Sequence, residues 1–226
     1  MIAVVATVAI AIATPIVLVV NGLRVVANPW FVKAEYGREG FPPDAYGLDT
    51  PERTDLALIG LRSIRPGGRG VELLEEATLP DGAPAFDQRE ISHMADVRRV
   101  FGAALRVQLI AGLAILVAAV GLARTRWRRV VPRGLLAGAA TTLGVAVLLV
   151  PVILLGFDTF FVRFHEVFFE GDSWRFSNVD TLLRLYHEQL WVDVARLVAA
   201  LTVVQVLLVG IGSYVVLRRL PQEVQP

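Results

Sequence analysis

The sequence contains no cysteine among its 226 residues. Disulfide bonds, thiolate metal ligands and a cysteine nucleophile are therefore excluded. Lysine occurs once, at Lys33, so arginine carries almost all of the positive charge. The formal net charge is only +1 and no basic groove is apparent, so we expect no nucleic-acid partner. We find no internal repeat and no low-complexity tail.

Apolar residues are abundant instead, at 55% of the chain, which is too many for an ordinary soluble domain. A membrane-crossing helix needs about 20 mostly apolar residues. Four runs meet this requirement, and we expect transmembrane helices at 1–26, 99–123, 134–156 and 192–217. The first run lacks a basic start and is longer than the core of a signal peptide. We interpret it as a retained helix rather than a cleaved signal.

The placement of arginine predicts the orientation. The connector 124–133 holds five arginines and no acid, and the tail 218–226 begins with two more. Because short basic loops stay in the cytoplasm, we expect the segments 27–98 and 157–191 to lie outside the cell. The expected fold is an α-helical integral membrane protein with four transmembrane helices. Both termini would be cytoplasmic, with a small extracellular α+β cap, in a multi-pass protein of the cytoplasmic membrane.

The segment 27–98 is too long and too patterned for a simple loop. Thr50-Pro51-Glu52 indicates the start of a helix. Residues 71–79 read as a strand, and Pro80-Asp81-Gly82 as a turn. Asp87-Gln88-Arg89-Glu90 fits a capping box, which starts a helix that continues into the second membrane span. A cap of this size buries little core alone, so we expect it to pack on the membrane part.

Two of the three histidines flank hydrophobic runs, each within a dense motif. His93 lies in Glu90-Ile91-Ser92-His93-Met94-Ala95-Asp96-Val97. His165 lies in a segment where phenylalanine recurs at helical spacing, at positions 157, 160, 161, 164, 168 and 169. Gly171 is expected to end this helix, and the next helix is expected near Ser177. Since imidazole exchanges protons near neutral pH, the pair suggests proton transfer on a lipid-like substrate.

A structural interpretation competes with this one. A histidine on an apolar stripe is more often a hydrogen-bonded packing residue than a catalyst, and phenylalanines beside a bilayer usually face lipid. Asp96 either orients His93 or pairs with Arg99. Both histidines are nevertheless expected at the same depth on the same side of the membrane, with carboxylates close in sequence. Ionisable groups at such a depth are costly, which favours a functional role.

The two motifs, Glu90–Val97 and Phe157–Phe176, resemble the two signatures of the bacterial lipoprotein intramolecular transacylase (Lit) family. The similarity covers nearly the whole chain. It implies an acyltransferase that moves the sn-2 acyl chain of a diacylglyceryl-cysteine lipoprotein to the α-amine of the same cysteine, giving the lyso form. It also implies that the catalytic histidines are His93 and His165, acting at the outer membrane–water interface. We expect no metal and no cofactor.

The remaining motif residues are the predicted substrate-binding set: Glu90, Met94, Asp96, Phe157, Asp158, Phe161, Phe164, Phe168, Phe169 and Trp174. The expected partners are a diacylated lipoprotein and membrane lipids, and we expect a monomer. The chain departs from the family pattern at 177–180 and at 185–188, where proline is usual. His187 therefore inherits no role, and we interpret it as a surface residue.

The chemistry agrees with these residues, because the substrate supplies its own amine nucleophile. The enzyme needs only a general base, for which we favour His165, and a general acid. Two rival classes remain open. The paired histidines would also suit a haem in an electron carrier, or, with a carboxylate, a zinc ion in a membrane hydrolase. A non-enzymatic membrane scaffold is the third alternative.

Overall fold

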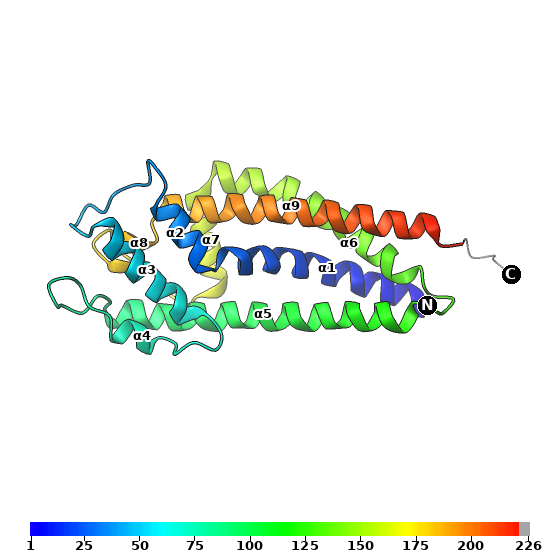
Figure 1. The fold of residues 1–226 in the computed structure, drawn as a ribbon, viewed down its shortest axis with the longest axis horizontal. Coiled ribbons are helices and arrows are strands. Elements are labelled where there is room, and N and C mark those ends of the chain that lie inside the picture. Colours follow the sequence, from blue (N-terminus) through cyan, green and yellow to red (C-terminus); the bar gives the residue numbers. More distant parts are fainter. Residues whose placement is uncertain (222–226) are drawn as a thin grey trace. The chain divides into compact units, whose positions relative to one another are not determined.

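The computed structural model describes residues 1–221, which are helical apart from turns, loops and one isolated antiparallel bridge. The helices are drawn in chain order in Figure 1. They are α1 (Ile2–Val26), α2 (Pro29–Tyr36), α3 (Thr50–Ile64), α4 (Glu72–Glu75), α5 (Gln88–Leu122), α6 (Val130–Leu155), α7 (Phe157–Phe168), α8 (Thr181–Leu185) and α9 (Glu188–Arg219).

The chain divides into two compact units. The first contains Met1–Leu23, Leu105–Val152 and the chain from Arg196 onward. It is built from α1, α6, the C-terminal part of α5 and most of α9. The second contains Arg24–Ala104 and Ile153–Ala195, and it holds the helices α2, α3, α4, α7 and α8.

Four helices are long and apolar enough to cross a membrane: Ala3–Val26, Gln88–Leu122, Val130–Ile153 and Glu188–Arg219. Each of them overlaps one of the four predicted spans over most of its length, and the expected α-helical membrane fold is confirmed. Helices α5 and α9 are longer than the hydrocarbon core of a bilayer requires. The points at which each helix enters and leaves the membrane stay predictions, as does the cytoplasmic placement of the termini.

Helix α1 approaches α6 closely because two glycines of α6 face it. A Cβ atom at Gly134 would lie 2.7 Å from the Cβ of Ile10, and one at Gly138 would lie 2.5 Å from the Cβ of Thr14. Glycines four residues apart allow two membrane helices to bring their backbones together. A larger residue at either position would push the two helices apart.

Polar side chains join α1 to the other helices of its unit. The Nε2 atom of Gln205 on α9 donates to the carbonyl of Leu18 at 3.2 Å, and its Oε1 accepts from the side chain of Asn21 at 2.7 Å. The side chain of Gln108 on α5 donates to the carbonyl of Val17 at 3.3 Å. Helix α1 accordingly lies between α5 and α9 in Figure 1.

Helix α3 is the centre of the second unit, where it packs against α2, α4 and α8. Its start is confirmed where Thr50-Pro51-Glu52 predicted it. Asp49 and Glu52 form a reciprocal capping box in which each side chain accepts the other residue's backbone N–H at 2.8 Å. The inner face of the helix is buried, including Leu56 and Leu61.

The strand predicted at 71–79 is wrong. This segment contains the short helix α4, whose Leu74 is buried. The predicted turn at 80–82 does form, with the Gly82 N–H donating to the Leu79 carbonyl at 2.9 Å. Beyond it only a single bridge joins Thr78 to Pro84. The Ala77 N–H, which a longer ladder would need, instead donates to the Leu74 carbonyl in α4, so the pairing does not extend, and the cap is helical rather than α+β.

Buried polar contacts hold the segment around α8 against α3. Arg184 forms an ion pair with Asp44 at 2.9 Å, and both side chains are buried. Hydrogen bonding to Arg184 lowers the pKa of Asp44 to about 2. The guanidinium of Arg53 donates to the carbonyls of Pro42 at 2.8 Å and of Arg184 at 3.0 Å. These contacts fix the backbone of α8, which in turn contacts the candidate site.

Candidate active site

The aromatic segment forms α7, and His165 lies in its last turn. Its Nδ1 atom is 2.7 Å from the carbonyl oxygen of Phe161, one turn earlier. Because a carbonyl oxygen only accepts, Nδ1 carries the proton and Nε2 keeps its lone pair. The rings of Phe161 and Trp174 lie 4.0 and 4.9 Å from the imidazole between centroids. His165 is thus held with Nε2 ready to accept a proton.

The end of this helix differs from the prediction. Helix α7 stops at Phe168, and the extended Phe169 donates its backbone N–H to the His165 carbonyl at 2.8 Å. Gly171 follows with a φ of 61° and lies in the turn after the helix, so it is not the residue at which the helix ends. Helix α8 begins at Thr181, after the predicted start near Ser177.

Helix α5 begins with the predicted capping box. Asp87 Oδ1 accepts the Glu90 N–H, and Glu90 Oε2 accepts the Asp87 N–H, both at 2.8 Å. Glu90 Oε1 accepts the backbone N–H of Leu182 at 2.7 Å. The side chain is only 3% exposed, and backbone amides occupy both of its oxygens. These contacts favour a positioning role for Glu90 over the predicted contact with substrate.

His93 lies one turn after Glu90 and meets His165. The two ring centroids are 6.1 Å apart and their planes differ by 25°. His93 is 7% exposed, and the rings of Phe169 and Phe176 contact it edge-on at 4.9 and 5.3 Å. The two motifs, which are far apart in sequence, therefore bring their histidines to one buried aromatic site within the second unit.

The site favours neutral imidazole. Burial lowers the pKa of His165 below its usual value of 6.5, and the hydrogen bond to Phe161 opposes this shift in part. At neutral pH this histidine is consequently a base with an empty Nε2 acceptor.

Two other nitrogens of the site are buried without a hydrogen-bond partner in the described part of the chain. They are Nδ1 of His93 and Nε1 of Trp174, whose side chain is 6% exposed. Buried polar groups almost always have partners, so such an atom calls for an explanation. A substrate oxygen would satisfy the indole N–H, and a substrate donor or acceptor would satisfy Nδ1 of His93, according to its tautomer.

The two predicted aspartates do not contact the histidine pair. Asp96 forms an ion pair with Arg99, which decides between the two alternatives that the sequence left open. Asp158 lies exposed in the first turn of α7. Within residues 1–221, no group of three or more histidine, aspartate or glutamate side chains is placed to hold a metal ion.

The predicted apolar residues differ in their distance from the pair. Met94 and Phe157 are buried. Phe164 is exposed, but its ring edge still contacts His165 at 5.6 Å. Phe168 is also exposed and contacts the ring of Phe164. Phe161, Phe169 and Trp174 therefore form the inner wall, and Phe168 lies at the outside.

Two residues were misjudged from sequence. His187 is half-buried rather than on the surface: its ring lies 4.8 Å from that of Phe41, and burial together with the charge of Arg53 lowers its pKa. Phe176 was omitted from the predicted site although it contacts His93. Its place two residues after Trp174 in the second motif was the available signal.

Comparison with known proteins gives matches along most of the chain. A family model described as "Lipoprotein intramolecular transacylase Lit" matches residues 8–191. A protein of Aquifex aeolicus (strain VF5), described only as uncharacterized, is 31% identical over 183 residues, which make up 79% of each chain.

Two solved structures share the fold. The in meso structure of the membrane integral lipoprotein intramolecular transacylase Lit from Bacillus cereus matches with a TM-score of 0.75 at 15% identity, covering 96% of this chain and 97% of that one. A histidine-to-arginine variant of the same protein matches with a TM-score of 0.65 at 15% identity, covering 96% and 93%. Since the family model covers well over half of the sequence, this chain belongs to the lipoprotein intramolecular transacylase (Lit) family of membrane acyltransferases.

Proposed function

We propose that this enzyme moves the sn-2 acyl chain of a diacylglyceryl-cysteine lipoprotein to the α-amine of the same cysteine, giving the lyso form. Family membership supports the class of reaction. The pairing of the buried His93 with the half-buried His165, whose ring centroids are 6.1 Å apart, is the observation that supports the mechanism. We place the reaction at the outer membrane–water interface of the cytoplasmic membrane, as the arginine distribution predicts, and propose a monomer with both termini inside.

The number of protons explains why two imidazoles are useful. A peptide α-amine has a pKa of about 7.7–8.0, so it is mostly ammonium at neutral pH. An amide N–H retains one of the three ammonium protons. Of the other two, one ends on the glyceryl oxygen and one goes to water. The proton that ends on the glyceryl oxygen needs a base beside the amine and an acid beside that oxygen, and we assign these tasks to the two imidazoles.

In the proposed sequence, the amine loses its first proton to water, because burial and the neighbouring His165 lower the pKa of His93 to about 4, well below that of the amine. The neutral amine nitrogen then attacks the carbonyl carbon of the ester while Nε2 of His165 accepts the second proton. The carbonyl electron pair moves onto oxygen, where its negative charge offsets the imidazolium charge of His165. When the bond between carbon and the glyceryl oxygen breaks, His93 passes the proton of His165 to that oxygen. Both histidines are then neutral again.

Trp174 is the group that we assign to the developing oxyanion. Its indole ring packs against His165, and its Nε1–H donor has no partner within residues 1–221. A donor already in place where charge develops costs no reorganisation during the reaction. Removal of one such donor from an acyl-transfer site typically lowers kcat by about 10²–10³-fold. Trp174 thereby gains a role more specific than substrate contact.

The aromatic wall would act on the geometry of the substrate. The reacting amine and ester belong to one molecule, separated by the cysteine side chain and part of the glycerol, so the transition state is a medium-sized ring. Closing this ring in free solution costs conformational entropy. Phe161, Phe169 and Phe176 surround the histidines and would hold the two reacting groups together.

Expression in a bacterial host whose lipoproteins carry plain diacylglyceryl groups tests the reaction. Mass spectrometry of an N-terminal lipopeptide should show an unchanged total mass, because the reaction is an isomerisation. Fragment ions should carry one acyl chain on nitrogen, which they should not do in the host without the enzyme. Unchanged fragments beside well-expressed enzyme would contradict the proposed function.

A further inference from the structure

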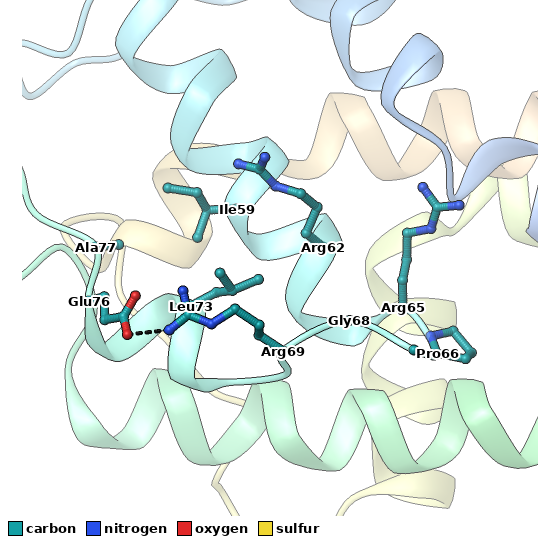
Figure 2. A pocket seen from close by; sticks show the side chains of 10 residues that line it. Ile59, Arg62, Arg65, Pro66, Gly68, Arg69, Leu73, Glu76 and Ala77 are labelled. Carbon is teal, nitrogen blue, oxygen red and sulfur yellow. Dashed lines mark hydrogen bonds and ion pairs between the residues drawn. The ribbon is translucent and has the colours of Figure 1, made fainter.

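The cap contains a second feature that the acyl transfer does not use, an open hollow of about 640 Å³ between α3, α4 and the loop that joins them. Figure 2 shows its lining. Three arginines, Arg62, Arg65 and Arg69, contribute to it, with Glu76 as the one acidic side chain. This concentration of positive charge is unusual in a segment that is otherwise rich in acids.

The charge of these arginines is only weakly compensated. Arg69 pairs with Glu76, but both side chains are 59% exposed, and such exposed pairs contribute little. The Nε–H of Arg62 donates to the Leu58 carbonyl at 3.1 Å, and Arg62 forms no ion pair within residues 1–221. Arg65 extends to the same side of the loop as Arg62 in Figure 2.

The loop below the arginines is held in a fixed shape. Arg98 of α5 donates to the carbonyls of Ser63 at 3.0 Å and of Gly68 at 3.3 Å. Gly70 has a φ of 87°, and a Cβ there would lie 2.4 Å from Nη1 of Arg98. Only glycine allows the loop to adopt this conformation beside Arg98. The hollow is therefore preformed, and a ligand would not have to order it.

The contact between Arg98 and the loop also indicates the depth of the hollow relative to the predicted membrane. An adjoining hollow of about 270 Å³ shares Arg69 and is lined by Arg98 and Arg99. These two residues stand where the polar start of α5 gives way to the apolar run predicted to begin at 99. This is the depth of lipid headgroups. Arginine is suited to phosphate there, since its planar fork donates two hydrogen bonds to two oxygens.

We propose that Arg62, Arg65 and Arg69 bind the phosphate of an anionic phospholipid of the surrounding leaflet, with the loop fixed by Arg98 as the base of the site. The bound lipid would hold the cap at the membrane surface. A free phosphate ion offers the same chemistry, whereas a zwitterionic lipid adds a positive group that the arginines repel. The proposal is independent of the acyl-transfer mechanism.

The test is a titration of the full-length purified protein with short-chain phosphatidylglycerol, followed by native mass spectrometry. Parallel titrations use phosphatidylcholine of the same chain length and inorganic phosphate. Each basic residue near an anionic lipid surface contributes about 1 kcal/mol, so Arg62→Gln/Arg65→Gln should weaken phosphatidylglycerol binding by about 10- to 30-fold. The control Lys33→Gln/Arg163→Gln removes two exposed positive charges elsewhere in the same unit and should bind like the wild type. The single variant Arg65→Gln gives an intermediate loss and guards against misfolding of the double variant.

The proposed site is supported if the wild type and the control variant bind phosphatidylglycerol more tightly than phosphatidylcholine and the arginine variants lose this preference. Equal binding of the two lipids by the wild type would overturn the proposal, as would equal losses in the double variant and its control. Arginine-dependent binding of inorganic phosphate that is as tight as that of the lipid would overturn the lipid assignment.

Discussion

Replacement of Glu90 by glutamine tests how the two motifs are held together. Both carboxylate oxygens of Glu90 accept backbone N–H groups, from Asp87 at 2.8 Å and Leu182 at 2.7 Å. A glutamine has one acceptor oxygen, so in Glu90→Gln an amide NH₂ must face one of these N–H donors. Loss of a hydrogen bond to a charged group, with a buried donor left unpaired, costs about 2–3 kcal/mol. In a chain of this length that corresponds to a fall in Tm of about 4–12 °C.

Glu52 provides a matched control, because it makes the same capping-box bond to Asp49 at 2.8 Å on the exposed side of α3. Water replaces the lost acceptor there, so Glu52→Gln should lower Tm by about 2 °C or less. Glu90→Gln should also slow turnover, since Glu90 fixes the helix start that carries His93. Tm from differential scanning fluorimetry and the rate of acyl migration, in the same detergent, measure the two effects. Equal losses of Tm in the two variants would refute the buried role of Glu90.

Three further predictions follow from the site. Trp174→Phe keeps the aromatic packing on His165 but removes the Nε1 donor. We expect kcat to fall about 10²–10³-fold with little change in KM. A rise in KM alone would contradict this role and assign Trp174 to ground-state binding. Because burial lowers the pKa of His165 below 6.5, more than half of it is in the base form at pH 6.5. The rate corrected for the fraction of neutral substrate amine should therefore fall by less than about twofold from pH 7.5 to 6.5, and a larger fall would contradict this shift. Phe161→Ala should lower turnover by up to about 10²-fold because Phe161 contacts His165. Phe168→Ala, at the exposed edge of the aromatic wall, should change turnover and Tm little. Similar mild effects of both variants would mean that the phenylalanines of α7 only face lipid.

Features specified by neighbouring residues were predictable from sequence. The apolar runs are each long enough to indicate their own helix, and α1, α5, α6 and α9 cover nearly all of them. The helix starts at Thr50 and after Asp87 depend on side chains three residues apart, and both capping boxes form as predicted. The phenylalanine stripe likewise predicted that His165 would face aromatic rings.

Features that depend on distant partners were missed. Glu90 is separated from Leu182 by 92 residues, so no local pattern could show that its second oxygen is occupied. His187 is half-buried because Phe41 covers its ring, which a reading of its neighbours in sequence does not predict. The strand predicted at 71–79 had suitable residues but found no partner strand, and the segment became α4. The meeting of His93 with His165 was expected from motif resemblance, and the surrounding Phe176 was not.

The most direct test of the central claim compares three purified histidine variants on a synthetic diacylglyceryl-cysteine lipopeptide. General acid–base assistance contributes about 10²–10⁴-fold, so His93→Ala and His165→Ala should each lose at least about 10²-fold in the rate of acyl migration while remaining monodisperse. His187→Ala, which also loses a half-buried imidazole, should be somewhat less stable but should turn over within about threefold of the wild type. Near-normal migration in His165→Ala, or equal losses in all three variants, would contradict the proposed catalysis by the pair.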